Sequence, residues 1–337
     1  MISPSTLFVV PGRAIADLLS KSHANVIGVV RDTYLAHGAA QTINPDSYFL
    51  RFDDKPEARI IALPAALKGD RAVSGIKWIA SYPSNIRVNL QRASATLILN
   101  DYETGYPIAF LEASQISAAR TAASAVLGAE VLGNGKHAKR LAVVGAGVIA
   151  RTIIEYFHAN SWSVESLVVH DLNQTDASHL ARAAEPLCAS AVVAASLDEA
   201  LQGASHVVFA TTAVQPYIHN SSWLTPRQII LNISLRDLAP EILIGSTNIF
   251  DDVEHCMKAS TSPHLAEQLT GNRDFVAGTL ADVISGNLDI DDDKPIIFSP
   301  FGLGVLDVAL GHYLLERACL HKLACPIEGF FPDTARW

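Results

Sequence analysis

Two glycines, an alanine and the helix that follows them have the types and spacing to bind a dinucleotide. Gly145, Gly147 and Ala150 form a G-x-G-x-x-A pattern directly after a short apolar run. In such a loop the first glycine permits a tight turn, the second lets the backbone approach a pyrophosphate, and the alanine allows close helix packing. The helix would point its free N–H groups, near Val148 and Ile149, at the phosphates.

Asp171 is the acidic residue that a dinucleotide-binding pattern needs after its glycines. It ends the next apolar run, SLVVHD, at about the distance from the glycines where a carboxylate bonds the adenosine ribose hydroxyls. The residues that follow, Leu172, Asn173 and Gln174, carry no charge that could neutralise a 2′-phosphate. The sequence therefore predicts NAD in preference to NADP, and favours a bound dinucleotide over a purely structural turn.

Lysine and arginine side chains interrupt apolar stretches in the first part of the chain. Lys77 in SGIKWIA, Arg51 in YFLRF and Arg59 in ARIIALP lie on expected strands, and Arg120 lies in an expected helix rich in alanine and serine. Such a cation either faces solvent or meets a bound anion, and periodicity leaves both readings open. If they converge, cations around one sheet would bind a diacid well.

Small polar residues and an aspartate follow the later apolar runs. In a doubly wound sheet, ligands bind at the carboxyl ends of the strands. Asp237, just past an expected strand, is a candidate for chemistry there, although it could equally cap the next helix. The residues singled out by this rule are Thr211, Thr212, Ser234, Asp237 and Ser299.

Neither a metal site nor a hydrolase site is predicted. The acidic run around Asp289 and Asp293 lacks the glycine of a calcium loop and is more typical of a solvated loop. His312, Cys319, His321 and Cys325 do not have the spacing of zinc ligands. A serine triad has no G-x-S-x-G turn to carry it.

Composition limits the class of protein. The chain has 337 residues, of which 49% are hydrophobic and 18% charged, so two domains around a cofactor cleft are expected. The net charge of −9 predicts neither nucleic-acid nor anionic-membrane binding. We expect no signal peptide and no membrane span, because the opening apolar run is brief and has no basic lead. Four scattered cysteines predict a reduced, cytoplasmic protein.

The expected fold is α/β in two parts. Strands at 48–52, 59–63 and 73–80, with a hairpin closed through Thr104-Gly105, predict an α+β substrate-binding and dimerisation domain with an antiparallel sheet, over residues 1–125. Alternating strands and helices over 126–302 predict a Rossmann-type doubly wound parallel sheet. A last helix is expected at 302–322. The C-terminal segment 303–337, which contains most of this helix, should return to the first domain.

The motifs together resemble the ornithine cyclodeaminase/μ-crystallin family, over nearly the entire chain. They include GIKW, ETGYPIAFLEA, SAARTAA, VVGAGVIA, LNISLRD and FSPFGLGVLD. Within that family RIIALP, SGIKWIAS and QRASATLILND are most similar to the branch that forms 2,3-diaminopropionate for siderophore or peptide-antibiotic biosynthesis. The resemblance implies a homodimer that pairs the sheets of its first domains.

The resemblance also implies roles for individual residues. Arg51, Lys77 and Arg120 match the family's substrate-carboxylate and cofactor-side cations, and Asp237 matches its catalytic acid/base. Arg59 and Arg92 belong to the branch-like motifs and would hold a second carboxylate. The chain departs from the cyclodeaminases around Asp237, where no C-P-G follows, and at the QRAS stretch that contains Arg92, which disfavours ornithine cyclisation.

The implied activity is NAD-dependent oxidative cleavage of N-(2-amino-2-carboxyethyl)-L-glutamate, a small amino-diacid substrate, to 2-oxoglutarate and L-2,3-diaminopropionate. In this reaction Lys77 would help orient the substrate and Asp237 would move protons. Two alternatives stay open. One is another reaction on the same scaffold, namely ornithine cyclodeamination, ketimine reduction or alanine-type dehydrogenation, and the other is a non-catalytic protein that retains NAD.

Overall fold

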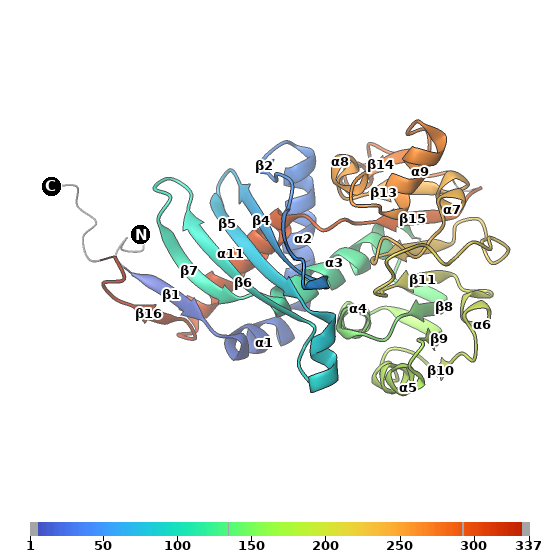
Figure 1. The fold of residues 1–337 in the computed structure, drawn as a ribbon, viewed down its shortest axis with the longest axis horizontal. Helices are drawn as coiled ribbons and strands as arrows, with labels where there is room; N and C mark the ends of the chain where they lie inside the picture. Colours follow the sequence, from blue (N-terminus) through green and yellow to red (C-terminus); the bar gives the residue numbers. More distant parts are fainter. Residues whose placement is uncertain (1–5, 134, 292, 332–337) are drawn as a thin grey trace. The chain divides into compact units, whose positions relative to one another are not determined.

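The chain folds into two compact units. The computed structural model describes residues 6–133, 135–291 and 293–331 (Figure 1). The first unit contains the chain up to Arg120 and from Leu303 onward, and the second contains Thr121–Gly302. Helix α3 (Ser114–Leu132) runs through the first boundary, which the sequence analysis placed at residue 125, further along the same helix.

The first unit is built on a mixed sheet. Its strand order is β16-β1-β7-β6-β5-β4-β2, with β3 paired to β4. The predicted antiparallel pairing is confirmed from β3 to β7, including the 93–112 hairpin. The sheet also contains one parallel pair, β1 with β7, which no short turn joins and forces to be antiparallel. The strands are β1 (Leu7–Val10), β2 (Thr42–Ile43), β3 (Tyr48–Phe52), β4 (Lys55–Leu67), β5 (Val73–Ser81), β6 (Ala93–Asp101), β7 (Pro107–Glu112) and β16 (Cys325–Ile327).

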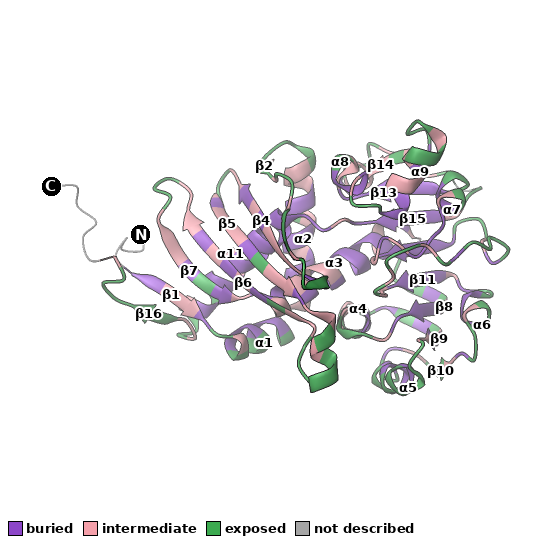
Figure 2. Cartoon of the chain, viewed as in Figure 1, coloured by how far each residue is buried: buried purple, intermediate pink, exposed green. Residues whose placement is uncertain are grey.

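Helix α11 (Gly304–Leu320) covers one face of this sheet. It packs on β4, β5 and α2 (His23–Gly38) and is buried along most of its length (Figure 2). Gly311 makes the close approach possible, because a Cβ there would lie 2.1 Å from the Leu97 side chain. Helix α11 lies in the stretch where a last helix was expected, and it belongs to the first unit. Helix α1 (Gly12–Ser20), α2 and the 3₁₀ turn η1 (Pro83–Val88) were not predicted.

The second unit is the doubly wound domain that the sequence predicted. All strand pairs in its sheet are parallel, in the order β10-β9-β8-β11-β12-β15-β13-β14. The chain runs outward from β8 to β10 and then returns to β11 on the other side of β8. The topological switch point therefore lies at the carboxyl ends of β8 and β11, where such folds bind ligands.

The elements of the second unit alternate as a doubly wound fold requires. The strands are β8 (His137–Val144), β9 (Ser163–His170), β10 (Ala191–Val193), β11 (His206–Phe209), β12 (Ile229–Asn232), β13 (Thr247–Phe250), β14 (Val276–Thr279) and β15 (Ile296–Ser299). The helices after the start of β8 are α4 (Val148–Ala159), α5 (Gln174–Ala183), α6 (Leu197–Leu201), α7 (Pro240–Ile244), α8 (Val253–Cys256), α9 (Ser262–Thr270) and α10 (Leu280–Ile284). Across the part of the chain that the structure describes, no helix is long and apolar enough to cross a bilayer.

Candidate functional site

The glycine loop lies at the switch point of the second unit. Gly145 has φ +96°, and a Cβ on it would lie 2.5 Å from the Ala210 carbonyl oxygen, so both backbone conformation and space require glycine. Gly147 precedes the first turn of α4, and a Cβ there would meet no atom within 4 Å. Because Val148 and Ile149 open α4, their N–H groups have no acceptor within the helix, and the loop can receive an anion.

Asp171 is held against this loop. Its carboxylate accepts hydrogen bonds from the N–H groups of Ala146, at 2.7 Å, and Asn173, at 2.8 Å. A cavity of about 420 Å³ opens beside the loop, lined by Gly147, Val148 and residues of α5. The acidic residue and the glycines, which are distant in sequence, therefore occupy the adjacent positions that a dinucleotide fold needs.

Asp237 is surrounded by three side-chain hydroxyl groups within the second unit. Its side chain is fully buried and accepts hydrogen bonds from Thr211 Oγ1, at 2.5 Å, from the Tyr217 hydroxyl, at 2.9 Å, and from Ser234 Oγ. Burial, and next the neighbouring Asp237 carboxylate, raise the pKa of Tyr217. The phenol therefore stays protonated and donates to the carboxylate.

The turn that carries Asp237 is not a helix cap. Helix α7 begins after Ala239, and no side chain caps its first turn, so the alternative reading of Asp237 as an N-cap is wrong. The preceding Leu235 has φ +66° although it is buried and not glycine. A branched, buried residue in this conformation is unusual and is found where the surroundings impose the geometry, as they do at functional sites.

Two of the polar residues predicted at strand ends are not among the groups that surround Asp237. Thr212 is exposed. Ser299 is fully buried at the end of β15, where its hydroxyl accepts a hydrogen bond from Asn232 Nδ2 at 2.9 Å. Both lie at the carboxyl ends of parallel strands, but within the described residues neither side chain is hydrogen-bonded to Asp237. A cofactor contact by either residue stays a prediction.

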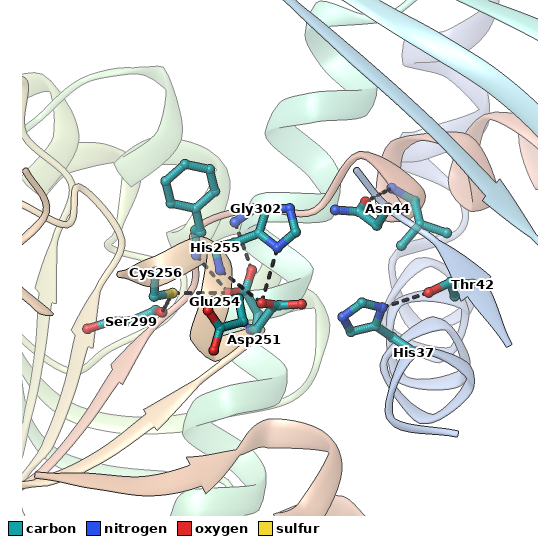
Figure 3. A network of polar contacts seen from close by, with 12 residues as sticks. His37, Thr42, Asn44, Asp251, Glu254, His255, Cys256, Ser299 and Gly302 are labelled. Carbon is teal, nitrogen blue, oxygen red and sulfur yellow. Dashed lines mark hydrogen bonds and ion pairs between the residues drawn. The ribbon is translucent and has the colours of Figure 1, made fainter. Parts of the chain in front are cut away.

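Asp251 fixes the last loop of the second unit. Its carboxylate accepts the N–H groups of Phe301, at 2.9 Å, and Gly302, at 2.7 Å, and faces the thiol of Cys256 (Figure 3). Burial raises the pKa of Asp251, although the hydrogen bonds from Gly302 and Phe301 act against this. The loop that ends the unit is thus tied to β13 by a buried carboxylate.

In the first unit, Lys77 and Arg120 share one carboxylate that the sequence analysis did not single out. Lys77 Nζ lies 2.6 Å from Asp307 Oδ2, and Arg120 Nε lies 3.3 Å from Asp307 Oδ1. Lys77 Nζ also donates to Ser117 Oγ at 3.1 Å. Lys77 and Asp307 are almost completely buried, whereas the Arg120 side chain is 12% exposed. Lys77 therefore does not face solvent.

Three more cations converge at one end of the same sheet. Arg51 and Arg59 are opposite each other in the β3–β4 ladder, and Arg59 is opposite Ser81 of β5. Arg92 Nε donates to Ser81 Oγ at 3.3 Å. Burial and then the Arg51 charge lower the pKa of Arg59, and burial and then the Arg59 charge lower the pKa of Arg92. Within the described residues, none of the three forms an ion pair with an acidic side chain.

Two residues of these clusters were missed by sequence reasoning. Asp307 carried a signal, because a charged residue among Val305, Leu306 and Val308 at the start of an apolar helix is out of place unless it is paired. Tyr217 carried none, since nothing in its local sequence shows that the segment runs beside Asp237. An isolated parallel β-bridge between Ile218 and Leu238 brings Tyr217 close to Asp237.

The fold and these clusters define a class, a two-unit α/β protein with a Rossmann-type sheet and a glycine loop at its switch point. The chain belongs to the ornithine cyclodeaminase/mu-crystallin family, whose model matches residues 25–322. The resemblance seen in the sequence motifs is therefore confirmed.

Individual relatives cover most of the chain. It is 31% identical to N-((2S)-2-amino-2-carboxyethyl)-L-glutamate dehydrogenase of Staphylococcus aureus, over 88% of this chain and 91% of the relative. Among solved structures, Thermococcus litoralis Δ1-pyrroline-2-carboxylate reductase in complex with NADH and L-proline matches with a TM-score of 0.86 at 22% identity, over 94% and 99% of the two chains. An archaeal alanine dehydrogenase dimer with bound NAD matches with a TM-score of 0.84 at 23% identity, over 96% and 99%. These two structures share the fold.

Proposed function

We propose that this protein is an NAD-dependent oxidoreductase that acts on a carbon–nitrogen bond, and that its substrate is N-(2-amino-2-carboxyethyl)-L-glutamate. The observation that carries the substrate assignment is the cluster of Arg51, Arg59 and Arg92, three cations that have no acidic partner within the described residues. A substrate with several carboxylates neutralises such a cluster, whereas a simple amino acid leaves it unpaired. The Staphylococcus aureus relative is named for this compound.

The cofactor assignment rests on the second unit. NAD, when bound, supplies the hydride acceptor. The open space at Gly147 and the first turn of α4 suit a pyrophosphate, and Asp171, which is hydrogen-bonded to this loop, would accept hydrogen bonds from ribose hydroxyls. Both structural neighbours contain NADH or NAD, which supports the same choice.

Substrate binding uses the charges of the first unit. The group formed by Lys77, Arg120 and Asp307 carries one net positive charge, which suits the α-carboxylate of the glutamate part. Lys77 and Ser81 lie on the same face of β5, because side chains alternate along a strand. The arginine cluster around Ser81 would therefore bind the remaining carboxylates on the sheet face that carries Lys77.

The reaction needs proton transfers that Asp237 can provide. Hydride leaves the glutamate Cα and the C–N bond becomes a ketimine. Water adds to this carbon, and the resulting carbinolamine collapses to 2-oxoglutarate and L-2,3-diaminopropionate. Asp237 takes a proton from the attacking water and returns one to the departing amine. The hydroxyls of Thr211, Tyr217 and Ser234 hold its carboxylate in place between these steps.

One assay tests the proposal. The protein is mixed with NAD and the synthetic adduct, NADH absorbance is followed, and the products are identified by mass spectrometry. We expect one NADH, one 2-oxoglutarate and one 2,3-diaminopropionate per adduct consumed. Ornithine, L-alanine and L-proline are run in parallel. Turnover of one of these without turnover of the adduct would replace the proposed substrate, and net proline formation from ornithine would identify a cyclodeaminase.

A homodimer through the first unit is part of the proposal. The sheet face opposite α11 leaves large apolar side chains uncovered, with Tyr48 70% and Trp78 44% exposed. An exposed face of this kind is typical of an interface. The archaeal alanine dehydrogenase neighbour is a dimer. Sedimentation of wild type and of Phe110→Glu, on the same face, tests this, and we expect a dimer and a monomer, respectively.

A further inference from the structure

Asp307 joins the last helix of the chain to both cations of the Lys77–Arg120 pair. It lies in the first turn of α11, Lys77 lies in the middle of β5, and Arg120 lies in α3. Each carboxylate oxygen accepts from a different cation, at 2.6 Å for Lys77 Nζ and 3.3 Å for Arg120 Nε. One buried side chain thus sets the positions of two charged groups that come from distant parts of the chain.

The charges in this group do not cancel. Two cations and one carboxylate leave one positive charge, and an uncompensated charge in a buried place is costly. The ammonium group of Lys77 has three N–H donors. Asp307 and Ser117 accept two of them, and the described residues supply no third acceptor. One donor and one charge are therefore left for a single monoanionic ligand.

We propose that Asp307 is a positioning residue that keeps Lys77 protonated and restricts the Lys77–Arg120 pair to one carboxylate of the substrate. This inference rests on the proposed function for the identity of the substrate, but not for the presence of a carboxylate. Asp307 itself does not touch the substrate. It acts through the lysine and the arginine, whose side chains contact the ligand.

The electrostatics of Lys77 explain why the carboxylate matters. The pKa of Lys77 is lowered from 10.5 to about 8 as the net result of burial, which lowers it most, of Asp307, which raises it, and of Arg120, which lowers it. The charged groups that face the ammonium are Asp307 on α11 and Arg120 on α3. If Asp307 loses its charge, both remaining influences act downward. Lys77 would then be largely neutral in the free protein at neutral pH, and a carboxylate ligand would have to bring a proton with it.

Proton uptake on binding measures this directly. The NADH-saturated protein is titrated calorimetrically with 2-oxoglutarate, and separately with pyruvate, at pH 7 in two buffers of different ionisation enthalpy. With a pKa of about 8 for Lys77, wild type should take up about 0.1 proton per ligand. Asp307→Asn should take up close to one proton and bind each oxo acid about tenfold or more weakly, the size expected for losing charge-assisted contacts.

Controls separate this role from a structural one. Glu316→Gln removes an exposed carboxylate from the same helix and should keep wild-type affinity and uptake. NADH affinity reports on the second unit and should be unchanged in Asp307→Asn. If Asp307→Asn fails to fold, the wild-type measurement still decides, because an uptake near one proton would show that Asp307 does not keep Lys77 charged.

The outcomes distinguish this inference from the proposed function. Unchanged uptake and affinity in Asp307→Asn would overturn the positioning role. Failure of wild type to bind either oxo acid would overturn the single-carboxylate site. Normal pyruvate binding with the predicted uptake in both proteins, but no NADH from the adduct, would reject the proposed substrate and leave the role of Asp307 standing.

Discussion

Arg59 is the middle member of the arginine cluster. Replacing it should weaken the use of the substrate without lowering the stability of the free protein. Arg59→Met keeps the aliphatic part of the side chain and removes the charge that faces Arg51 and Arg92. A charged hydrogen bond contributes about 1.5–3 kcal/mol, so kcat/KM for the adduct should fall roughly 10- to 150-fold. Like charges opposite each other in a ladder cost about 0.2–1 kcal/mol, so the free protein should be unchanged or more stable by that amount.

The assay compares two substrates and two variants. The second substrate is the same adduct built on L-alanine, which lacks the glutamate side-chain carboxylate, and Arg59→Met should change its kcat/KM less than twofold. Arg87→Met, an exposed arginine on η1, serves as the matched control and should behave as wild type. Stability is followed by thermal unfolding without ligand. Equal losses on both substrates, or a clear loss of stability, would refute the reading of this cluster as a carboxylate site.

Three further predictions concern the cofactor loop, the acid/base group and pH. Asp171→Ser should weaken NAD binding about tenfold or more, because ribose hydroxyls lose a charged acceptor, and an unchanged NAD affinity in a fluorescence titration would remove this role. Asp237→Asn should lower kcat about 10²- to 10⁴-fold while NAD still binds, and full turnover would show that Asp237 is not the acid/base group. The pKa of Lys77, about 8 against 10.5, means that the unfolded chain binds more protons between these values, so stability rises with pH across this window by about 3 kcal/mol in all. Chemical unfolding at several pH values should show this rise in wild type and not in Lys77→Met, and equal pH slopes would contradict the lowered pKa.

Local sequence was sufficient to predict much of the second unit. The apolar runs that end in Asn232 and Ser299 became parallel strands, and the glycine at residue 145 became the turn that only glycine permits. These features depend on neighbours in the chain, through side-chain periodicity and backbone conformation. The parallel pairing of β1 with β7 was missed because it depends on contacts far apart in sequence.

The burial and the charge partner of each charged side chain could not be predicted from local sequence. Lys77 and Arg51 have similar local sequences, yet the first is buried against Asp307 and the second is exposed beside Arg59. Burial and charge partners come from the register of four strands and from the helix packed on them. A pattern of alternating residues indicates on which face of a sheet a side chain lies, but it does not indicate what covers that face.

By itself the sequence determined the fold class, the glycine turn between β8 and α4, and the family, because each depends on short stretches whose spacing is imposed by backbone geometry. Only the tertiary structure decided that Asp307 pairs with Lys77 and Arg120, that three arginines meet around Ser81, and that hydroxyls surround Asp237. Electrostatic interactions depend on distance and burial in space. Those two quantities exist only once residues far apart in the chain have been packed together.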